Sequence, residues 1–258
     1  MTFPFYKITL PCDEYLFAHL QAHAQLENIT KGRLGNTLIK KTSAGIPLVR
    51  TTSQYQNPAQ AFLTCHQQIV EHIKTALKQQ ALPETDFNNA LAEVYDASYS
   101  TMKYHSDQCL DIKKPSCIAL FSCYENPDLL TDKHIRTLRV KHKNSDEQFD
   151  IPLTHNSVVL FSTDTNAQYH HKIILQKTPS FKKGETDNKW FGLTFRESKT
   201  FINFKNGQPY LNNGQRLTFA TESEQKQYYK LRGEENKSLE FNYPPINYTL
   251  SAADLLEP

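Results

Sequence analysis

A histidine and an aspartate stand two positions apart in the stretch Met102-Lys103-Tyr104-His105-Ser106-Asp107. In an extended segment, side chains at positions i and i+2 point to the same side of the chain, so His105 and Asp107 can reach one small ligand together. An imidazole and a carboxylate are two of the three protein ligands of a non-haem Fe(II) site that leaves its other positions open. The spacing therefore predicts a third ligand from a distant strand.

Two adjacent histidines in the strand-like run 169–175 are candidates for that third ligand. His171 shares its side of the strand with Tyr169 and Ile173. His170 shares its side with Lys172. A ligand that faces the inside of a small barrel should alternate with apolar residues, so the pattern favours His171 over His170. The other histidine would then face outward or support the ligands.

Arg196 follows in the apolar run WFGLTFRES. A guanidinium in such a strand can bind a carboxylate with two parallel hydrogen bonds. The alternative is an arginine at a strand edge whose head reaches water. Beside a histidine and aspartate that could hold a metal, we expect Arg196 to meet the carboxylate of a keto-acid co-substrate.

These residues fall in a region that is predicted to be a series of short strands. The runs are rich in β-branched and aromatic residues and are separated by turn residues. We expect an α+β fold with a double-stranded β-helix (jelly roll) core and helices packed on one face. The predicted strands are LAEVYDASYSTMKYH, CIALFSCY, IRTLRVKH, FDIPL, SVVLFS, YHHKIILQ and WFGLTFRESKTFINF.

Two helices are predicted before these strands. Asp13 is expected to cap the first. For the second, Asn57 is expected to be the cap and Pro58 to lie in the first turn. His66 and His72 fall in the second helix without partners, so we expect both at the surface.

A third helix is predicted in the C-terminal tail, where Thr221 or Ser223 caps the run TESEQKQYYKLRGEENK and Gly233 ends it. No internal repeat or low-complexity linker divides the chain, so we expect one compact domain. Its expected parts are an N-terminal support segment (1–90), a jelly-roll catalytic core (91–205) and a C-terminal extension (206–258).

Composition limits the function classes. Only 8 glycines occur, which argues against a glycine-rich phosphate loop, and the net charge of +2 neither requires nor excludes a nucleic-acid partner. No apolar run approaches the roughly 20 residues of a membrane helix, and no signal peptide is recognisable. The cysteines are odd in number and contain no CxxC pair, which favours reduced thiols and a cytoplasmic location. They are Cys12, Cys65, Cys109, Cys117 and Cys123.

The order of these features resembles the AlkB-like branch of the 2-oxoglutarate- and Fe(II)-dependent dioxygenases. The resemblance covers roughly residues 90–202 and is carried by EVYDASYSTMKYHSD, IRTLRV, SVVLFSTDTNAQYHHKI and GLTFR. It implies Fe(II), 2-oxoglutarate and O₂ as cofactors. It also implies iron ligation by His105, Asp107 and His171, with Tyr95 and Arg196 binding 2-oxoglutarate.

Three positions depart from the family pattern. The arginine that binds the distal carboxylate of 2-oxoglutarate in the family falls on Trp190, the polar residue two further on falls on Gly192, and an asparagine falls on Glu93. The distal carboxylate therefore needs another anchor, for which Lys189, Lys103 and Tyr95 are candidates. We expect Trp190, the only tryptophan, to lie close to the bound acid.

The resemblance also implies hydroxylation or oxidative demethylation of an N-alkylated substrate, most often a nucleic-acid base. Basic tracts that could follow a phosphate backbone are KTPSFKKGETDNK, RTLRVKHK and KGRLGNTLIKK, together with Arg50. The same tracts could instead be solvated edges of strands. Two alternatives stay open: the same chemistry on a protein, lipid or small molecule, and a non-enzymatic β-sandwich binding module.

Overall fold

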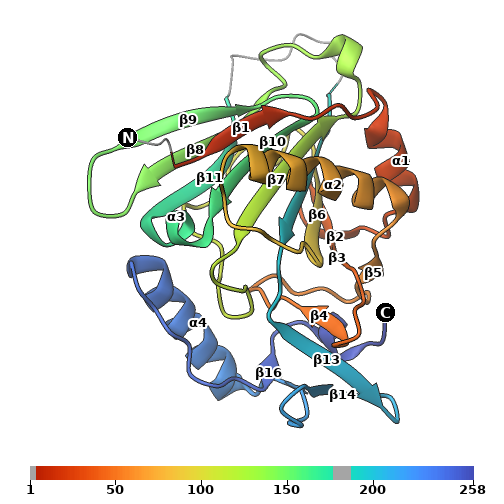
Figure 1. Cartoon of the computed structure of the whole chain (residues 1–258), viewed down its shortest axis with the longest axis vertical. Helices are drawn as coiled ribbons and strands as arrows, with labels where there is room; N and C mark the ends of the chain where they lie inside the picture. The colour runs from red at the N-terminus through yellow and green to blue at the C-terminus, as the bar shows by residue number, and fades with distance from the viewer. Residues whose placement is uncertain (1–3, 177–186) are drawn as a thin grey trace.

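The computed structural model describes residues 4–176 and 187–258, most of which belong to antiparallel sheet and its connections (Figure 1). The largest sheet has the strand order β1-β10-β7-β12-β6-β3-β2, with β5 paired to β3. Its strands are β1 (Tyr6–Thr9), β2 (Glu27–Thr30), β3 (Arg33–Ile39), β5 (Gln60–Ala61), β6 (Asn89–Tyr95), β7 (Cys117–Tyr124), β10 (Ser157–Ser162) and β12 (Trp190–Arg196).

A smaller sheet packs against one face of the large sheet. Its order is β11-β8-β9, formed by β11 (Tyr169–Leu175), β8 (Arg136–His142) and β9 (Gln148–Leu153). The two sheets share an apolar core to which Leu120 and Trp190 contribute from the large sheet and Leu138 and Ile173 from the small one. This pair of facing sheets is the predicted jelly roll.

Helices cover the other face of the large sheet. Side chains alternate along β12, so Phe191, Leu193 and Phe195 point away from the jelly-roll interior. They join a second core with α1 (Leu16–His23) and α2 (Thr64–Gln79), which lie across this face in Figure 1. The structure thus confirms the predicted helices on one face.

The second helix begins later than predicted. Gln60 and Ala61 form β5, which pairs with β3, and α2 starts only at Thr64. Pairing with an open strand edge satisfies backbone groups that a first helical turn leaves without partners. Asn57 and Pro58 therefore lie before a strand, and the prediction that they begin the helix is wrong.

His66 is buried and not at the surface, which corrects a second expectation. Its side chain is 4% exposed, and its Nδ1 accepts a hydrogen bond from the backbone N–H of Leu63 at 2.9 Å. The ring also packs on Phe62, with 5.9 Å between the ring centroids. His66 therefore supports the start of α2 as a neutral imidazole.

Smaller elements complete the chain. The tail helix α4 (Glu222–Lys237) is capped by Thr221 as predicted, but it runs on through Gly233. Asp13 accepts a hydrogen bond from Tyr15 before α1 and does not cap that helix. The others are β4 (Ile46–Leu48), α3 (Thr163–Gln168), β13 (Thr200–Lys205), β14 (Gln208–Leu211), β15 (Thr218–Phe219) and β16 (Tyr248–Thr249), with short 3₁₀ turns at Pro127–Leu129 and Ala252–Leu255.

Across residues 4–176 and 187–258, no helix has the length and apolar character to cross a membrane.

The buried imidazole predicts a pH-dependent stability. Burial lowers the pKa of His66 to about 4, whereas a histidine in the unfolded chain titrates near 6.5. Between these values the unfolded state binds a proton that the folded state does not, so the free energy of unfolding falls as the pH falls. We expect His66 to account for a loss of about 2 kcal/mol between pH 7 and pH 5.

Urea unfolding at the two pH values measures this loss. The variant His66→Gln keeps an oxygen that can accept from Leu63 but cannot titrate, so its stability should fall less between pH 7 and pH 5. An equal fall in both proteins would show that His66 does not carry the effect.

Candidate metal centre

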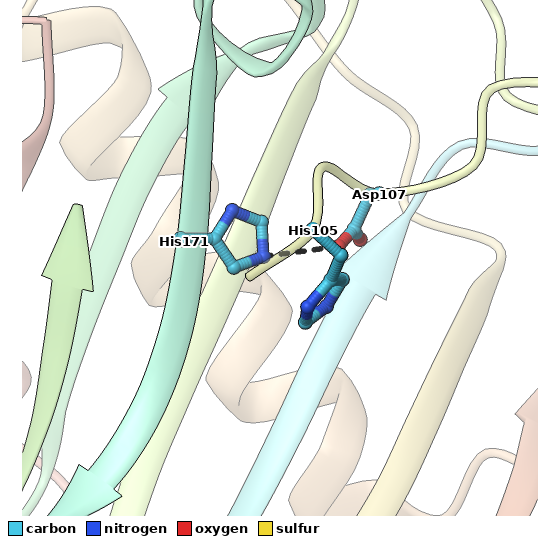
Figure 2. Close-up of side chains that lie close together, drawn as sticks. All are labelled: His105, Asp107 and His171. Atoms are coloured by element: carbon cyan, nitrogen blue, oxygen red, sulfur yellow. Dashed lines mark ion pairs between the residues drawn. The ribbon is translucent and has the colours of Figure 1, made fainter. Parts of the chain in front are cut away.

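His105, Asp107 and His171 come together at one end of the jelly roll (Figure 2). The backbones of His105 and His171 are paired, with N–H···O distances of 3.0 and 2.7 Å in the two directions. One ligand atom of each of the three side chains lies within 4.8 Å of the other two. His171 Nε2 is 3.3 Å from Asp107 Oδ1.

His170 lies on the opposite side of β11. Its Nε2 is 2.6 Å from the backbone oxygen of Asn236 in α4. Of the two neighbouring histidines, the structure therefore brings His171 into the cluster and directs His170 toward the tail helix, which is the arrangement that strand alternation favours.

Neighbouring groups fix the orientation of the cluster. Nδ1 of His105 is 3.0 Å from the carbonyl oxygen of Lys103, which leaves Nε2 for a metal. The N–H of Asp107 donates to Asn166 Oδ1 at 2.7 Å, and Asn166 Nδ2 donates back to the carbonyl of Asp107 at 2.8 Å. Asn166 in α3 thus holds the peptide groups of the aspartate.

Arg196 pairs with the same aspartate. Its Nε and Nη2 lie 2.8 and 2.6 Å from Asp107 Oδ2. Burial raises the pKa of the Asp107 carboxyl, but Arg196 and His171 outweigh burial and hold that pKa well below its usual range. Burial, followed by the nearby His171, lowers the pKa of His105 to about 4. At neutral pH, Asp107 is therefore charged and His105 is neutral, as ligands of a divalent metal must be.

The cluster fits a ferrous ion. It offers two imidazoles and one carboxylate, the set that suits an oxygen-activating iron with open positions. Asp107 binds Arg196 through Oδ2, which leaves Oδ1 on the side of His171. The three residues also border one cavity, so a metal held by them would face open space.

This cavity has a volume of about 440 Å³, within the range of small-molecule sites. Its wall combines apolar residues of both sheets, such as Leu120 and Ile173, with a few polar groups. The charged and hydroxyl-bearing residues among them include Arg33, Thr51, Glu93, Tyr95, Lys103, Thr194, Arg196 and Arg232.

Tyr95 and Arg33 both border the cavity, and both donate hydrogen bonds to the carboxylate of Glu93. The hydroxyl of Tyr95 donates to Glu93 Oε2 at 2.9 Å, and Nε of Arg33 donates to Glu93 Oε1 at 2.7 Å. Arg33 thus balances the negative charge that replaces the asparagine of the family pattern. Lys103 also borders the cavity.

Lys189 and Trp190 are placed differently from Tyr95. Lys189 forms an ion pair with Glu125 at 3.2 Å, and neither Lys189 nor Trp190 is among the described residues that line the cavity. The indole of Trp190 is 1% exposed and stacks on Tyr95, with 4.8 Å between the ring centroids. The ring of Tyr95 therefore lies between Trp190 and the cavity.

Trp190 and Gly192 form a coupled pair. The indole folds back over Gly192, so that a Cβ added there would meet ring atoms of Trp190 at 2.0 to 2.6 Å. The ring can adopt this position only because residue 192 has no side chain. The two departures from the family pattern at positions 190 and 192 therefore depend on each other, because the indole occupies the space that a side chain at 192 would fill.

Comparison with known proteins agrees with this geometry. A sequence model of the 2OG-Fe(II) oxygenase superfamily matches residues 23–196, more than half of the 258-residue chain. The chain therefore belongs to this superfamily, and it is a 2-oxoglutarate-dependent non-haem iron dioxygenase whose cofactors are Fe(II), 2-oxoglutarate and O₂. No match was found among curated proteins.

Two solved structures are similar to this chain. OsALKBH1 has a TM-score of 0.51 and 11% sequence identity, over 76% of this chain and 99% of its own. A prolyl-4-hydroxylase from Pseudomonas putida has a TM-score of 0.45 and 15% identity, over 76% of this chain and 94% of its own. At 11% identity, the similarity to OsALKBH1 describes the fold alone.

Two residues of the site escaped the sequence analysis. Arg33 lies in β3, which precedes the predicted strands and joins the large sheet beside β6. The run Thr37-Leu38-Ile39 contains two β-branched residues and an apolar leucine, a strand signal that could have placed it. Asn166 lies in α3, in a polar run that reads as a turn in the sequence, and no local signal distinguishes it from its polar neighbours.

Removing the guanidinium beside Asp107 should destabilise the metal-free protein. In Arg196→Gln a buried carboxylate loses its cation, so we expect the free energy of unfolding to fall by about 3 kcal/mol at pH 7. The low pKa of Asp107 contributes stability above the unfolded value near 4, and this contribution is lost as the pH falls. The difference in the free energy of unfolding between Arg196→Gln and the unaltered protein should therefore become smaller as the pH falls.

Chemical unfolding of the metal-free proteins tests this. Lys113→Gln is a matched control, because Lys113 pairs with Glu197 at 2.6 Å but is 50% exposed and should contribute less than about 1 kcal/mol. A deficit for Arg196→Gln as small as that of the control would contradict the prediction.

Proposed function

We propose that this dioxygenase removes alkyl groups from nitrogen atoms of nucleic-acid bases, with His105, Asp107 and His171 as its iron ligands. The observation that carries the proposal is the convergence of these three side chains on one cavity. Iron together with 2-oxoglutarate and O₂ supplies the oxidation of a substrate C–H bond to an alcohol. When that carbon is attached to nitrogen, the hydroxylated product releases formaldehyde.

The protein residues position these partners. Asp107 stays charged through Arg196, and His105 is oriented by the carbonyl of Lys103. Arg196 borders the cavity, and we assign its remaining N–H groups to the carboxylate of 2-oxoglutarate nearest the metal. The apolar side chains of both sheets limit the access of water to this end of the cavity.

Arg33 is our candidate for the distal carboxylate of 2-oxoglutarate. It is a cation in the cavity wall, and it lies opposite Tyr95 in the pairing of β3 with β6. Arg33 and Tyr95 already hold one carboxylate between them, that of Glu93. Among the described residues, no acceptor is bound to Nη1 of Arg33, which can therefore donate to a second carboxylate.

The nucleic-acid substrate is supported by a small group of residues beside the site. Lys103 is exposed and borders the cavity. Tyr104 follows it, with the Nζ of Lys172 at 4.4 Å from its ring centroid, and Lys141 is exposed on the neighbouring strand. Lysines beside an aromatic ring can bind phosphates and stack bases.

The basic tracts offer fewer exposed cations for binding a phosphate backbone than the sequence suggested. Arg50 and Arg136 are buried, 4% and 2% exposed. Arg50 pairs with Asp111 at 2.7 Å, and both guanidinium ends of Arg136 donate to backbone carbonyls. Most of the lysine-rich tract KTPSFKKGETDNK, residues 177–186, lies outside the described residues.

We also propose that residues 1–90, 91–205 and 206–258 are parts of one domain, because β3 joins the same sheet as the core strands and α4 contacts the site. A cytoplasmic location is proposed from the five cysteines, all of which are free thiols.

Titration with two keto acids tests the role of Arg33. We expect Arg33→Met to weaken binding of 2-oxoglutarate by roughly 10- to 100-fold, because a charged hydrogen bond is lost. Binding of 2-oxobutyrate, which has no distal carboxylate, should change little. Calorimetry on the Co(II)-loaded protein without O₂ measures both affinities.

The control is Lys189→Met, which should bind both acids as the unaltered protein does. Equal weakening of the two acids by Arg33→Met would mean that Arg33 shapes the cavity and does not select a dicarboxylate.

An N-methylated oligonucleotide tests the substrate class. With 2-oxoglutarate and O₂ present, the protein should release formaldehyde from the oligonucleotide and form succinate and CO₂ from 2-oxoglutarate, and Asp107→Ala should abolish both. We expect the double variant Lys141→Glu/Lys172→Glu to bind the oligonucleotide more weakly and to lower the slope of log K against log salt by roughly 1–2. The control is Lys78→Glu, the same lysine-to-glutamate change at an exposed position of α2.

If succinate formed with a peptide or small molecule but not with the oligonucleotide, the protein would still be a dioxygenase, but the proposed nucleic-acid substrate would be wrong.

A further inference from the structure

The tail helix α4 has little of the apolar face that normally attaches a helix to a domain. Only Tyr228 and Glu235 are buried among its 16 residues. Most helices in proteins are stabilised by packing an apolar stripe. Figure 1 shows α4 away from α1 and α2, which cover the large sheet. Tyr228 and Leu231 pack in a small apolar cluster, and the other contacts of α4 described below are polar.

The strongest of these contacts involve Ser106, the residue between the ligands His105 and Asp107. Its N–H donates to Asn236 Oδ1 at 2.9 Å, and its carbonyl accepts from Nη2 of Arg232. Both polar groups of this backbone position are thus bound by side chains of α4. A rotation of the peptide groups that would move the two ligands would break these bonds.

The next residues of the same segment are also bound to α4. The N–H of Cys109 donates to Glu235 Oε1 at 2.8 Å, and Nε2 of Gln108 donates to the hydroxyl of Tyr228 at 2.7 Å. Glu235 is buried, and its other oxygen accepts from Arg232 at 3.1 Å. The buried charge is therefore compensated, as a stable polar contact requires.

The same end of α4 also contacts β11, the strand that carries His171. Nε2 of His170 is 2.6 Å from the backbone oxygen of Asn236. Lys143, at the end of β8 next to β11, donates to the carbonyl of Ser238 at 2.8 Å. Asn236 therefore contacts both chain segments that supply ligands, through its side chain to one and through its backbone to the other.

We propose that α4 is a part of the metal centre, in which Asn236 is a positioning residue that sets the distance between the segment 105–107 and β11. The inference rests on the proposed iron ligands. The two segments are far apart in sequence and are also joined at this end by the pairing of His105 with His171 and, through α3, by the hydrogen bonds of Asn166 with Asp107. A further connection through α4 restricts the ligands before the metal binds, which raises affinity by reducing the ordering that binding requires.

Cobalt binding by the full chain tests the proposal without turnover. Co(II) is titrated into the metal-free protein without O₂, and both its affinity and its visible absorption spectrum are recorded. Asn236→Ala should weaken Co(II) binding by about 10-fold, the lower end of the effect of residues that orient metal ligands, and should change the spectrum. Asn236→Asp keeps the acceptor for Ser106 and should restore most of the affinity.

Two further variants complete the test. Lys230→Ala changes a side chain of α4 that is 77% exposed, so its binding and spectrum should equal those of the unaltered protein. His170→Ala removes only the contact with β11 and should also weaken Co(II) binding, which serves if Asn236→Ala does not fold. Circular dichroism and thermal unfolding of the metal-free proteins establish that they are folded.

The outcomes separate this proposal from the one on which it rests. Unchanged affinity and spectrum in both Asn236→Ala and His170→Ala would overturn the role of α4. If the unaltered protein bound no Co(II), or if His171→Ala bound it equally well, the proposed iron ligands would be wrong.

Discussion

The backbone pairing of His105 with His171 is the contact on which the site depends. Its two hydrogen bonds, of 3.0 and 2.7 Å, join a segment that follows β6 to the start of β11. The pairing places Asp107 next to His171, and all three residues border the cavity. No side chain of the cluster could supply this placement by itself, because each ligand atom depends on the position of the backbone that carries it.

Charge balance is the second constraint. Each buried or half-buried arginine at the cavity has an acidic neighbour: Arg196 has Asp107, Arg33 has Glu93 and Arg232 has Glu235. Unpaired, any of these charges would be costly to bury. These pairs therefore carry little net charge before any cofactor binds, and Lys103 adds a positive charge to the cavity wall. A dianionic co-substrate shares the arginines with these carboxylates, through N–H groups such as Nη1 of Arg33 that are bound to no acceptor among the described residues.

The sequence predicted the core strands and the cluster because their signals are local. Strands such as Cys117–Tyr124 are short, mainly apolar runs that include β-branched and aromatic residues, and the alternation along β11 separated His171 from His170. The failures concern tertiary contacts. His66 is buried because α2 packs on the sheet, and Arg33 reaches the cavity because β3 adds to β6. The strands that bury His66 and the strand β6 beside Arg33 are distant in sequence, so the pattern of neighbouring residues does not reveal these contacts.

The indole of Trp190 over Gly192 has a consequence for how this sequence could have arisen. A relative that acquired the tryptophan before the glycine would have to place its indole elsewhere, since in the position seen here the ring would overlap the Cβ of residue 192. The ring packs on Tyr95 in this way only when residue 192 is glycine, so the two sites should covary among relatives.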